Sequence, residues 1–130
     1  MNGWFFTAGV LLLMAFFVHS LAGNRLYSSA RPDRDGSRAC DAWLMGRCGM
    51  QMIGVDLLLA GGFLLAAGSG LMPRSRTLEL FLGLTYGGWT AGWLLSLAVE
   101  RSSARHYRRL CQWILFLVVA VLIGVGILVD

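Results

Sequence analysis

The sequence predicts an all-α polytopic membrane protein, an antiparallel bundle of four transmembrane helices in a single domain over residues 1–130. Three observations predict this fold class. The chain contains four apolar runs, at about residues 4–22, 48–72, 78–99 and 110–129. Its composition is 57% hydrophobic and 14% charged, whereas a soluble domain carries about 25% charged residues. The connections between the runs are too short to fold as a soluble domain.

Each apolar run has the length that a membrane crossing requires. A helix needs about 20 apolar residues to cross a hydrocarbon core of about 30 Å, at about 1.5 Å per residue. Because no water is present there to satisfy backbone groups, such runs cross as helices. We expect the first run to be retained as a helix, since no basic residue precedes it as in a signal peptide, although Ser20 and Ala22 resemble a cleavage site.

The first half of the chain is predicted as a helix, a polar loop and a second helix. The helix over 4–22 is expected to stop at Gly23 and Asn24, which are typical of helix ends. Residues 28–41 form the longest polar stretch and are predicted as a loop. A short interfacial helix over 37–45 is the alternative for its last part.

The second half is predicted as two further crossings joined by short connections. Residues 71–76 form a tight turn, so the helices over 48–72 and 78–99 are expected to be antiparallel neighbours. Residues 100–109 then lead into the last helix, over 110–129.

The arginines predict the orientation of the chain. All 11 basic residues are Arg, and the formal net charge is +4. Nine lie in the first and third connections, which the positive-inside rule places in the cytoplasm, with both termini periplasmic in a bacterial inner membrane. Anionic lipid headgroups are the expected partner of these arginines, and nucleic acid is not. The nine are Arg25, Arg31, Arg34, Arg38, Arg47, Arg101, Arg105, Arg108 and Arg109; Arg74 and Arg76 lie in the second connection.

Small residues recur at helical spacing in the two middle runs. In lipid, helices associate by close backbone packing, and small residues spaced by four allow that approach. Two interpretations stay open: packing inside the bundle, or a face that binds a second copy or a partner subunit. The second interpretation predicts an accessory or assembly subunit of a larger membrane complex. The glycines are Gly54, Gly61 and Gly68 in the second run and Gly83, Gly87, Gly88 and Gly92 in the third.

Asp56 is the most unusual polar residue of the predicted membrane segments. It lies nine residues after Arg47, about 13 Å into the membrane at helical rise. An ionisable group there costs about 2.5–3.5 kcal/mol, so it usually faces the protein interior and has a partner. Asp56 is therefore either a paired structural group or a proton, cation or substrate site.

Other polar residues lie in the same cytoplasmic half of the predicted membrane segments. They are His19, Gln51, Ser96 and Glu100. Together with Asp56 they predict a polar site, and the alternative function that follows is an oligomeric small transporter or channel. On the third run, Trp89 and Trp93 form an aromatic stripe with Tyr86, which indicates either packing or a lining for an apolar or cationic ligand.

The cysteines give the one enzymatic interpretation. Cys40-Asp41, followed by Cys48, resembles the loop cysteine pair of the vitamin K epoxide reductase family, a four-helix membrane fold. The resemblance implies a membrane thiol-redox enzyme using Cys40 and Cys48. The chain departs from that family because Cys111 stands alone and no C-x-x-C is present. A non-enzymatic role is therefore favoured, with no cofactor and no metal site expected.

A second resemblance rests on the end of the first run. The stretch His19-Ser20-Leu21-Ala22-Gly23-Asn24-Arg25 is similar to an H-S-x-x-G-x-R-like junction of small uncharacterised bacterial inner-membrane proteins with four helices. Asn24 departs from that pattern, where an acidic residue is expected. The resemblance implies the fold and no activity.

Overall fold

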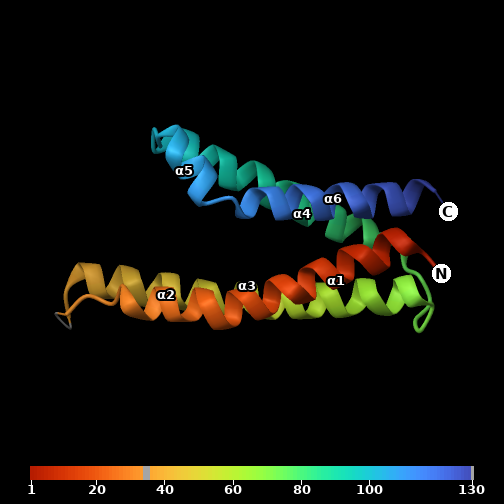
Figure 1. The fold of residues 1–130 in the computed structure, drawn as a ribbon, viewed down its shortest axis with the longest axis horizontal. Helices are drawn as coiled ribbons and strands as arrows, with labels where there is room; N and C mark the ends of the chain where they lie inside the picture. The colour runs from red at the N-terminus through yellow and green to blue at the C-terminus, as the bar shows by residue number, and fades with distance from the viewer. Residues whose placement is uncertain (34–35, 130) are drawn as a thin grey trace.

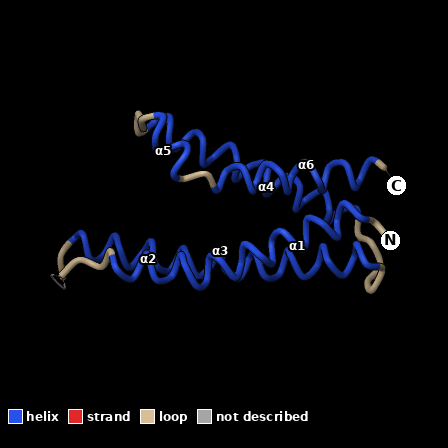
Figure 2. Tube along the Cα trace, viewed as in Figure 1, coloured by secondary structure: helices blue, strands red, loops and turns tan. Residues whose placement is uncertain are grey.

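The computed structural model describes residues 1–33 and 36–129. Arg34 and Asp35, which the sequence analysis places in the first connection, and Asp130 lie outside the described residues. The described part forms five continuous helical segments and no strand (Figure 2). The all-α prediction is therefore confirmed.

The helices are longer at the predicted cytoplasmic end than the sequence analysis expects. α1 (Gly3–Val18) continues through a π-helical turn, η1 (His19–Gly23), into α2 (Asn24–Ser29). α3 spans Arg38–Ser69, so the loop predicted over 28–41 gives way to helix at Arg38, where the alternative helix over 37–45 is predicted, and this helix is continuous with the span predicted over 48–72. The Ser37 hydroxyl caps α3 by accepting a hydrogen bond from the Cys40 N–H at 3.1 Å.

The second half of the chain follows the predicted order more closely. α4 spans Arg76–Val99, the short α5 spans Ala104–Arg109 and α6 spans Gln112–Leu128. α3 ends at Gly70, whose φ of +83° is left-handed and favours glycine. The Leu71 N–H closes this end by donating to the Ala66 carbonyl at 2.9 Å.

Two helices are long and apolar enough to cross a membrane, judged by length and composition. They are the continuous helix Gly3–Ser29, of 27 residues, and α3, of 32 residues. α6 is apolar but has only 17 residues. α4 has 24 residues, but its glycines and its hydroxyl-bearing residues lower its mean hydropathy. Two of the four predicted spans thus pass this test.

The helices form two hairpins that diverge like a V (Figure 1). α3 packs along α1, α6 packs along α4, and α1 with α6 holds the hairpins together. Both chain ends and the α3–α4 connection lie at the closed end, whereas the α2–α3 connection and α5 lie at the two open tips. The prediction that the second and third runs pack along each other is wrong, because each of α3 and α4 has another helix as its main neighbour.

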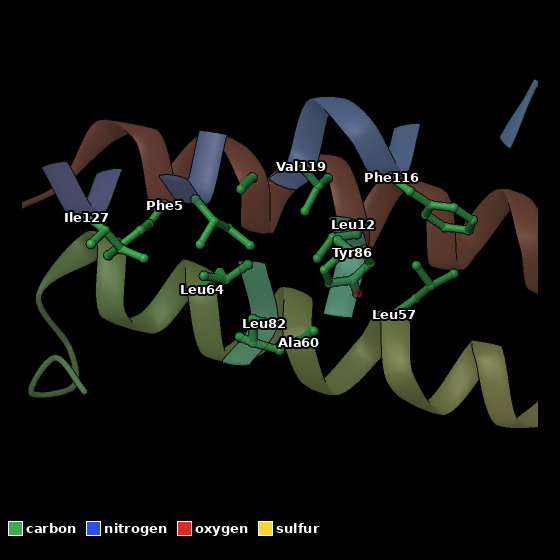
Figure 3. Close-up of a cluster of buried hydrophobic side chains, with 12 residues drawn as sticks. Phe5, Leu12, Leu57, Ala60, Leu64, Leu82, Tyr86, Phe116, Val119 and Ile127 are labelled. Carbon is green, nitrogen blue, oxygen red and sulfur yellow. The ribbon is translucent and has the colours of Figure 1, made fainter. Parts of the chain in front are cut away.

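A core of buried apolar side chains fills the closed part of the V (Figure 3). α1, α3, α4 and α6 all contribute to it, so the two hairpins share one core. Its fully buried members are Phe5, Ala8, Leu12, Leu64, Tyr86, Val119 and Ile123.

Glycines set the close approach of α1 to α3. A Cβ on Gly9 would lie 2.5 Å from the Leu65 N and 2.8 Å from the Gly61 O. A Cβ on Gly68 would lie 2.8 Å from the Phe6 Cα. Only hydrogen atoms fit at these positions, so the two backbones pack directly on one another.

Asn2 ties three helices together at the closed end. Its Oδ1 accepts hydrogen bonds from the N–H groups of Trp4 and Phe5, at 3.0 and 3.2 Å, and so caps α1. Its Nδ2 donates to the Gly126 carbonyl of α6, and its backbone N–H donates to the Gly68 carbonyl of α3, both at 2.8 Å. These bonds fix the point from which the hairpins diverge.

An ion pair between a buried carboxylate and a partly exposed arginine lies beside Phe5 of α1. Glu79 of α4 is fully buried, and its two carboxylate oxygens each accept a 2.9 Å hydrogen bond from Arg74. The Arg74 guanidinium also lies 4.7 Å from the ring centroid of Phe5. The hydrogen bond to Glu79 raises the pKa of Arg74 above its ordinary value, so this guanidinium stays charged.

Candidate functional site

Asp56 is paired across the gap between the hairpins. The Tyr86 hydroxyl of α4 donates a 2.8 Å hydrogen bond to Oδ2 of Asp56 on α3. Tyr86 is fully buried and Asp56 is half-buried. The half-buried Asp56 carboxylate therefore has a hydrogen-bond donor from the opposite hairpin.

Tyr86 belongs to an aromatic cluster on the inner side of the V. Its ring lies 5.5 Å from Trp89 and 6.1 Å from Phe116, between centroids. Trp89 and Trp93 also pack against Phe116, at 5.4 and 6.1 Å. The predicted aromatic stripe of α4 therefore packs against α6 as well as facing the gap.

The gap between α3 and α4 holds an apolar groove of about 510 Å³. One wall comes from α3 through Ile53, and most of the remainder comes from α4. The Ser96 hydroxyl donates to the Gly92 carbonyl at 2.8 Å, so it adds no unpaired donor to the groove. The groove is lined by Ile53, Gly88, Trp89, Gly92, Trp93, Ser96, Leu97, Leu110 and Phe116.

The predicted small-residue faces divide into engaged and open positions. A Cβ on Gly61 would meet Leu12 Cβ at 3.1 Å, and one on Gly83 would meet Ile123 Cγ2 at 3.3 Å. The engaged positions are Gly54, Gly61, Gly68 and Gly83. At Gly87, Gly88 and Gly92 a Cβ would meet nothing within 4 Å. The predicted glycines of α3 therefore serve packing within the chain, and those of α4 other than Gly83 are unfilled.

His19 lies apart from Asp56, in a second and smaller cavity. Its Nε2 lies 2.7 Å from the Met50 carbonyl oxygen. The cavity has a volume of about 220 Å³ and lies between the π-helical turn and α3. It is lined by Phe16, His19, Ser20, Asn24, Met50, Gln51, Gly54, Val55 and Leu58.

The polar residues predicted as one site thus occupy four places. His19 and Gln51 share the second cavity, Ser96 lines the apolar groove, and Asp56 bonds to Tyr86. Glu100 is exposed at the end of α4, where its backbone N–H donates to the Ser96 carbonyl.

Tyr86 is the hydrogen-bond partner of Asp56, although its sequence pattern predicts only membership of the aromatic stripe. A depth count identifies it. Asp56 lies 14 residues before Gly70, and Tyr86 lies 11 residues after Ser75. At helical rise these separations are about 21 and about 17 Å from the shared connection, so both groups lie at similar depth.

The two cysteines of the predicted redox pair lie on one helix. Cys40 and Cys48 are both in α3, eight residues or about 12 Å apart along the axis. A disulfide needs Cα atoms within about 7 Å, so pairing would require α3 to unwind. Among residues 1–33 and 36–129, no group of three or more His, Cys, Asp or Glu side chains is arranged to hold a metal ion.

Comparison with family models, curated proteins and solved structures gives no match for this chain. Its function is therefore inferred from its own geometry.

Proposed function

We propose that this chain is an accessory or assembly subunit of the bacterial inner membrane, which crosses the bilayer four times and receives a transmembrane helix of a partner protein along α4. The observation that carries the proposal is the open small-residue face formed by Gly88, Gly92 and Ser96 in the apolar groove.

The outward-facing residues support insertion in lipid. Only 22% of the most apolar window of Gly3–Ser29 and 39% of that of α3 are buried inside the protein. Monomeric soluble proteins rarely expose such large apolar surfaces, which lipid would cover. Exposed apolar residues on the four long helices include Met14, Phe17, Leu59, Leu84, Leu95 and Val121, all more than half exposed.

The placement of the termini supports an even number of crossings. Both chain ends lie at the closed end of the V, and the arginine-rich connections lie at the open tips (Figure 1). Under the positive-inside rule the open tips would face the cytoplasm and the termini the periplasm.

A helix is the favoured occupant of the groove because other glycines of this chain already serve close packing between helices. Gly9 and Gly68 let α1 and α3 meet backbone to backbone. Gly88 and Gly92 offer the same close approach on α4, with no side chain of this protein filling it. A flexible acyl chain gains little from such a face, whereas a helix backbone gains extensive van der Waals contact.

The pairing of Asp56 favours this role over transport. Its carboxylate accepts a hydrogen bond from the Tyr86 hydroxyl, and His19 lines a cavity whose walls do not include Asp56. Both observations support a structural role for Asp56. The separation of Cys40 and Cys48 along α3 likewise favours a non-redox role.

Site-specific photo-crosslinking in native membranes tests the proposal. A photo-reactive amino acid in place of Gly92 is expected to crosslink to an apolar helix of a different membrane protein. The matched control is the same group in place of Gly62 of α3, where a Cβ would also meet nothing within 4 Å but which lies outside the groove residues. Gly88→Leu, which fills the groove, should abolish the crosslink at position 92.

The crosslinked products decide between interpretations. Crosslinks to lipid alone, or equal crosslinking from positions 62 and 92, would contradict a docking groove. Crosslinks only to other copies of this chain would replace the accessory role with a homo-oligomer.

A further inference from the structure

The cavity beside His19 lies near the cytoplasmic boundary of the membrane in the proposed embedding. His19 follows Gly3 by 16 residues, or about 24 Å at helical rise, within a hydrocarbon core of about 30 Å. Phe16, Val55 and Leu58 form its apolar wall. Ser20 and Gln51 give it polar groups at the depth where lipid headgroups begin.

A π-helical turn builds one side of this cavity. In η1 the Asn24 N–H donates to the His19 carbonyl, five residues back, instead of four. Such turns widen a helix locally and occur frequently at functional sites. The Asn24 Oδ1 in the same wall is buried and has no hydrogen-bond partner, so the wall is short of one donor.

The hydrogen bond of His19 defines what its free nitrogen offers. A carbonyl only accepts, so Nε2–H donates to the Met50 carbonyl at 2.7 Å. In the neutral ring Nδ1 is then an acceptor. The cavity therefore offers an acceptor on His19 and a hydroxyl on Ser20, within a space of about 220 Å³.

A cation lies beside the wall of the cavity. Arg47 Nη1 donates to the Asn24 carbonyl at 3.2 Å, which places the guanidinium beside a residue that lines the cavity. A guanidinium has five N–H donors and suits phosphate geometry. An acceptor-bearing cavity beside an arginine fits a ligand that is anionic and carries a hydroxyl.

We propose that this cavity binds the headgroup of an anionic phospholipid that carries a free hydroxyl, of the phosphatidylglycerol type. The phosphate contacts Arg47, the headgroup hydroxyl donates to Nδ1 of His19, and an acyl chain follows Val55 and Leu58 toward the membrane centre. The volume equals that of about seven waters, which suits a glycerol headgroup. The proposal rests on the membrane embedding proposed above and does not depend on a partner helix.

Native mass spectrometry of the full chain in mild detergent tests the site, with phosphatidylglycerol, phosphatidic acid and phosphatidylcholine supplied in equal amounts. We expect one retained phosphatidylglycerol, preferred about tenfold over phosphatidylcholine. Arg47→Gln should remove the preference for both anionic lipids. His19→Phe removes the contact to the headgroup hydroxyl and leaves Arg47 in place, so it should lower phosphatidylglycerol to the level of phosphatidic acid.

Matched variants separate the site from general effects of charge or folding. Arg38→Gln and His106→Phe remove exposed groups of the same kinds elsewhere and should leave the preference unchanged. Gln51→Met is the second test of the cavity, for use if His19→Phe fails to fold. It alters the cavity wall and leaves the hydrogen bond of His19 to Met50 in place, and it should lower the preference for phosphatidylglycerol. The thermal midpoint of each variant reports folding.

Three outcomes would overturn the proposal. They are equal retention of phosphatidylglycerol and phosphatidylcholine, an unchanged preference in Arg47→Gln, or binding of soluble glycerol phosphate as tight as that of the lipid, which would make a free metabolite the ligand. Failure of the chain to float with liposomes is a separate result, since it would contradict the membrane embedding itself.

Discussion

Tyr86 and Asp56 form the polar link between the two hairpins, with the tyrosine hydroxyl 2.8 Å from Oδ2 of the carboxylate. The link lies between the closed end, where Asn2 bonds to α3 and α6, and the open end, where the hairpins diverge. It satisfies two polar groups that water would not reach in a bilayer. The Tyr86–Asp56 hydrogen bond therefore limits how far the two hairpins diverge.

Loss of the tyrosine hydroxyl should weaken the fold. Tyr86→Phe leaves the Asp56 carboxylate without its partner and keeps the ring in its aromatic cluster. Interhelical hydrogen bonds in membranes contribute about 0.6 kcal/mol on average, and an unpaired carboxylate adds to the loss, so we expect about 1–2 kcal/mol. Unfolding in mixed detergent micelles measures it.

Tyr107→Phe is the control for this change, because it removes a hydroxyl in α5, outside the core. Equal losses from both variants would contradict the role of the link. Asp56→Asn should cost less than Tyr86→Phe, since an amide oxygen still accepts the hydroxyl.

Loss of the same link should widen the open end of the V. Cys48 and Cys111 are exposed and lie on different hairpins, so spin labels on these natural cysteines report the separation. In a Cys40→Ser background, Tyr86→Phe is expected to broaden the distance distribution toward longer values. An unchanged distribution would show that the contacts of α1 with α6 alone set the opening.

The small-residue faces of α3 predict a contrast between two glycines of one helix. Gly68→Ala drives a methyl group into the backbone of Phe6, with the Cα at 2.8 Å and no flexible side chain to move aside. We expect a loss of about 1–3 kcal/mol in the free energy of unfolding.

Gly62→Ala is the matched control on α3, because a Cβ there meets nothing within 4 Å. It should be neutral or stabilising by up to about 1 kcal/mol, since alanine favours helix. Similar losses of stability in Gly68→Ala and Gly62→Ala would contradict this explanation, because the close approach of α1 would then not account for the cost of Gly68→Ala.

The sequence predicts the helical content of this chain because apolar runs of about 20 residues are the pattern of membrane-crossing helices. It predicts the early start of α3 only as an alternative, the helix over 37–45, since Arg38 and Asp41 resemble a polar loop. Contacts distant in sequence stabilise that helical turn instead. The rings of Tyr27 and Trp43 stack at 5.7 Å, and Trp43 Nε1 donates to the Tyr27 carbonyl at 3.0 Å.

The candidate site was predictable only in part. Spacing identified the glycines, but which of them are filled depends on how α3 and α4 pair with other helices, and no local pattern encodes that. Asp56 was recognised from its depth alone. Asp56 and His19 are separated because Tyr86 of α4 contacts α3 at Asp56, whereas His19 contacts α3 at Met50. Only the three-dimensional arrangement of the helices reveals these contacts.

The ion pair at the closed end predicts a graded response to substitution. Arg74→Gln leaves the buried Glu79 without this partner, and because the arginine side chain is 30% exposed we expect about 1–3 kcal/mol rather than the full cost of a buried pair. Arg74→Lys should lose less stability than Arg74→Gln, since an ammonium keeps the positive charge beside Glu79. It should still lose some, because an ammonium does not reproduce the two parallel hydrogen bonds. Thermal unfolding in detergent measures both.

Arg76→Gln is the control for this series, because Arg76 begins α4 two residues later and is exposed. Because the pKa of Arg74 is raised, its charge is present below its ordinary pKa and is lost only as the pH rises far into the alkaline range. The Arg74 contribution should therefore be constant through neutral pH. A stability difference between wild type and Arg74→Gln that disappears at mildly alkaline pH would contradict this assignment.

Four crossings with the arginines inside make a prediction about thiol access. Cys48 and Cys111 are exposed near the arginine-rich ends of α3 and α6, whereas Cys40 is only 3% exposed. A membrane-impermeant maleimide should therefore label the first two from the cytoplasmic side, in inverted vesicles, and neither in intact spheroplasts. Cys40 should react only after unfolding, because its thiol is enclosed by the fold.

Two labelling results would contradict this topology. If α4 and α6 did not cross the bilayer, Cys111 would not have to lie on the same side of the membrane as Cys48, and the two cysteines could label from opposite sides. Labelling of both cysteines from the periplasmic side would reverse the orientation that the arginine distribution predicts.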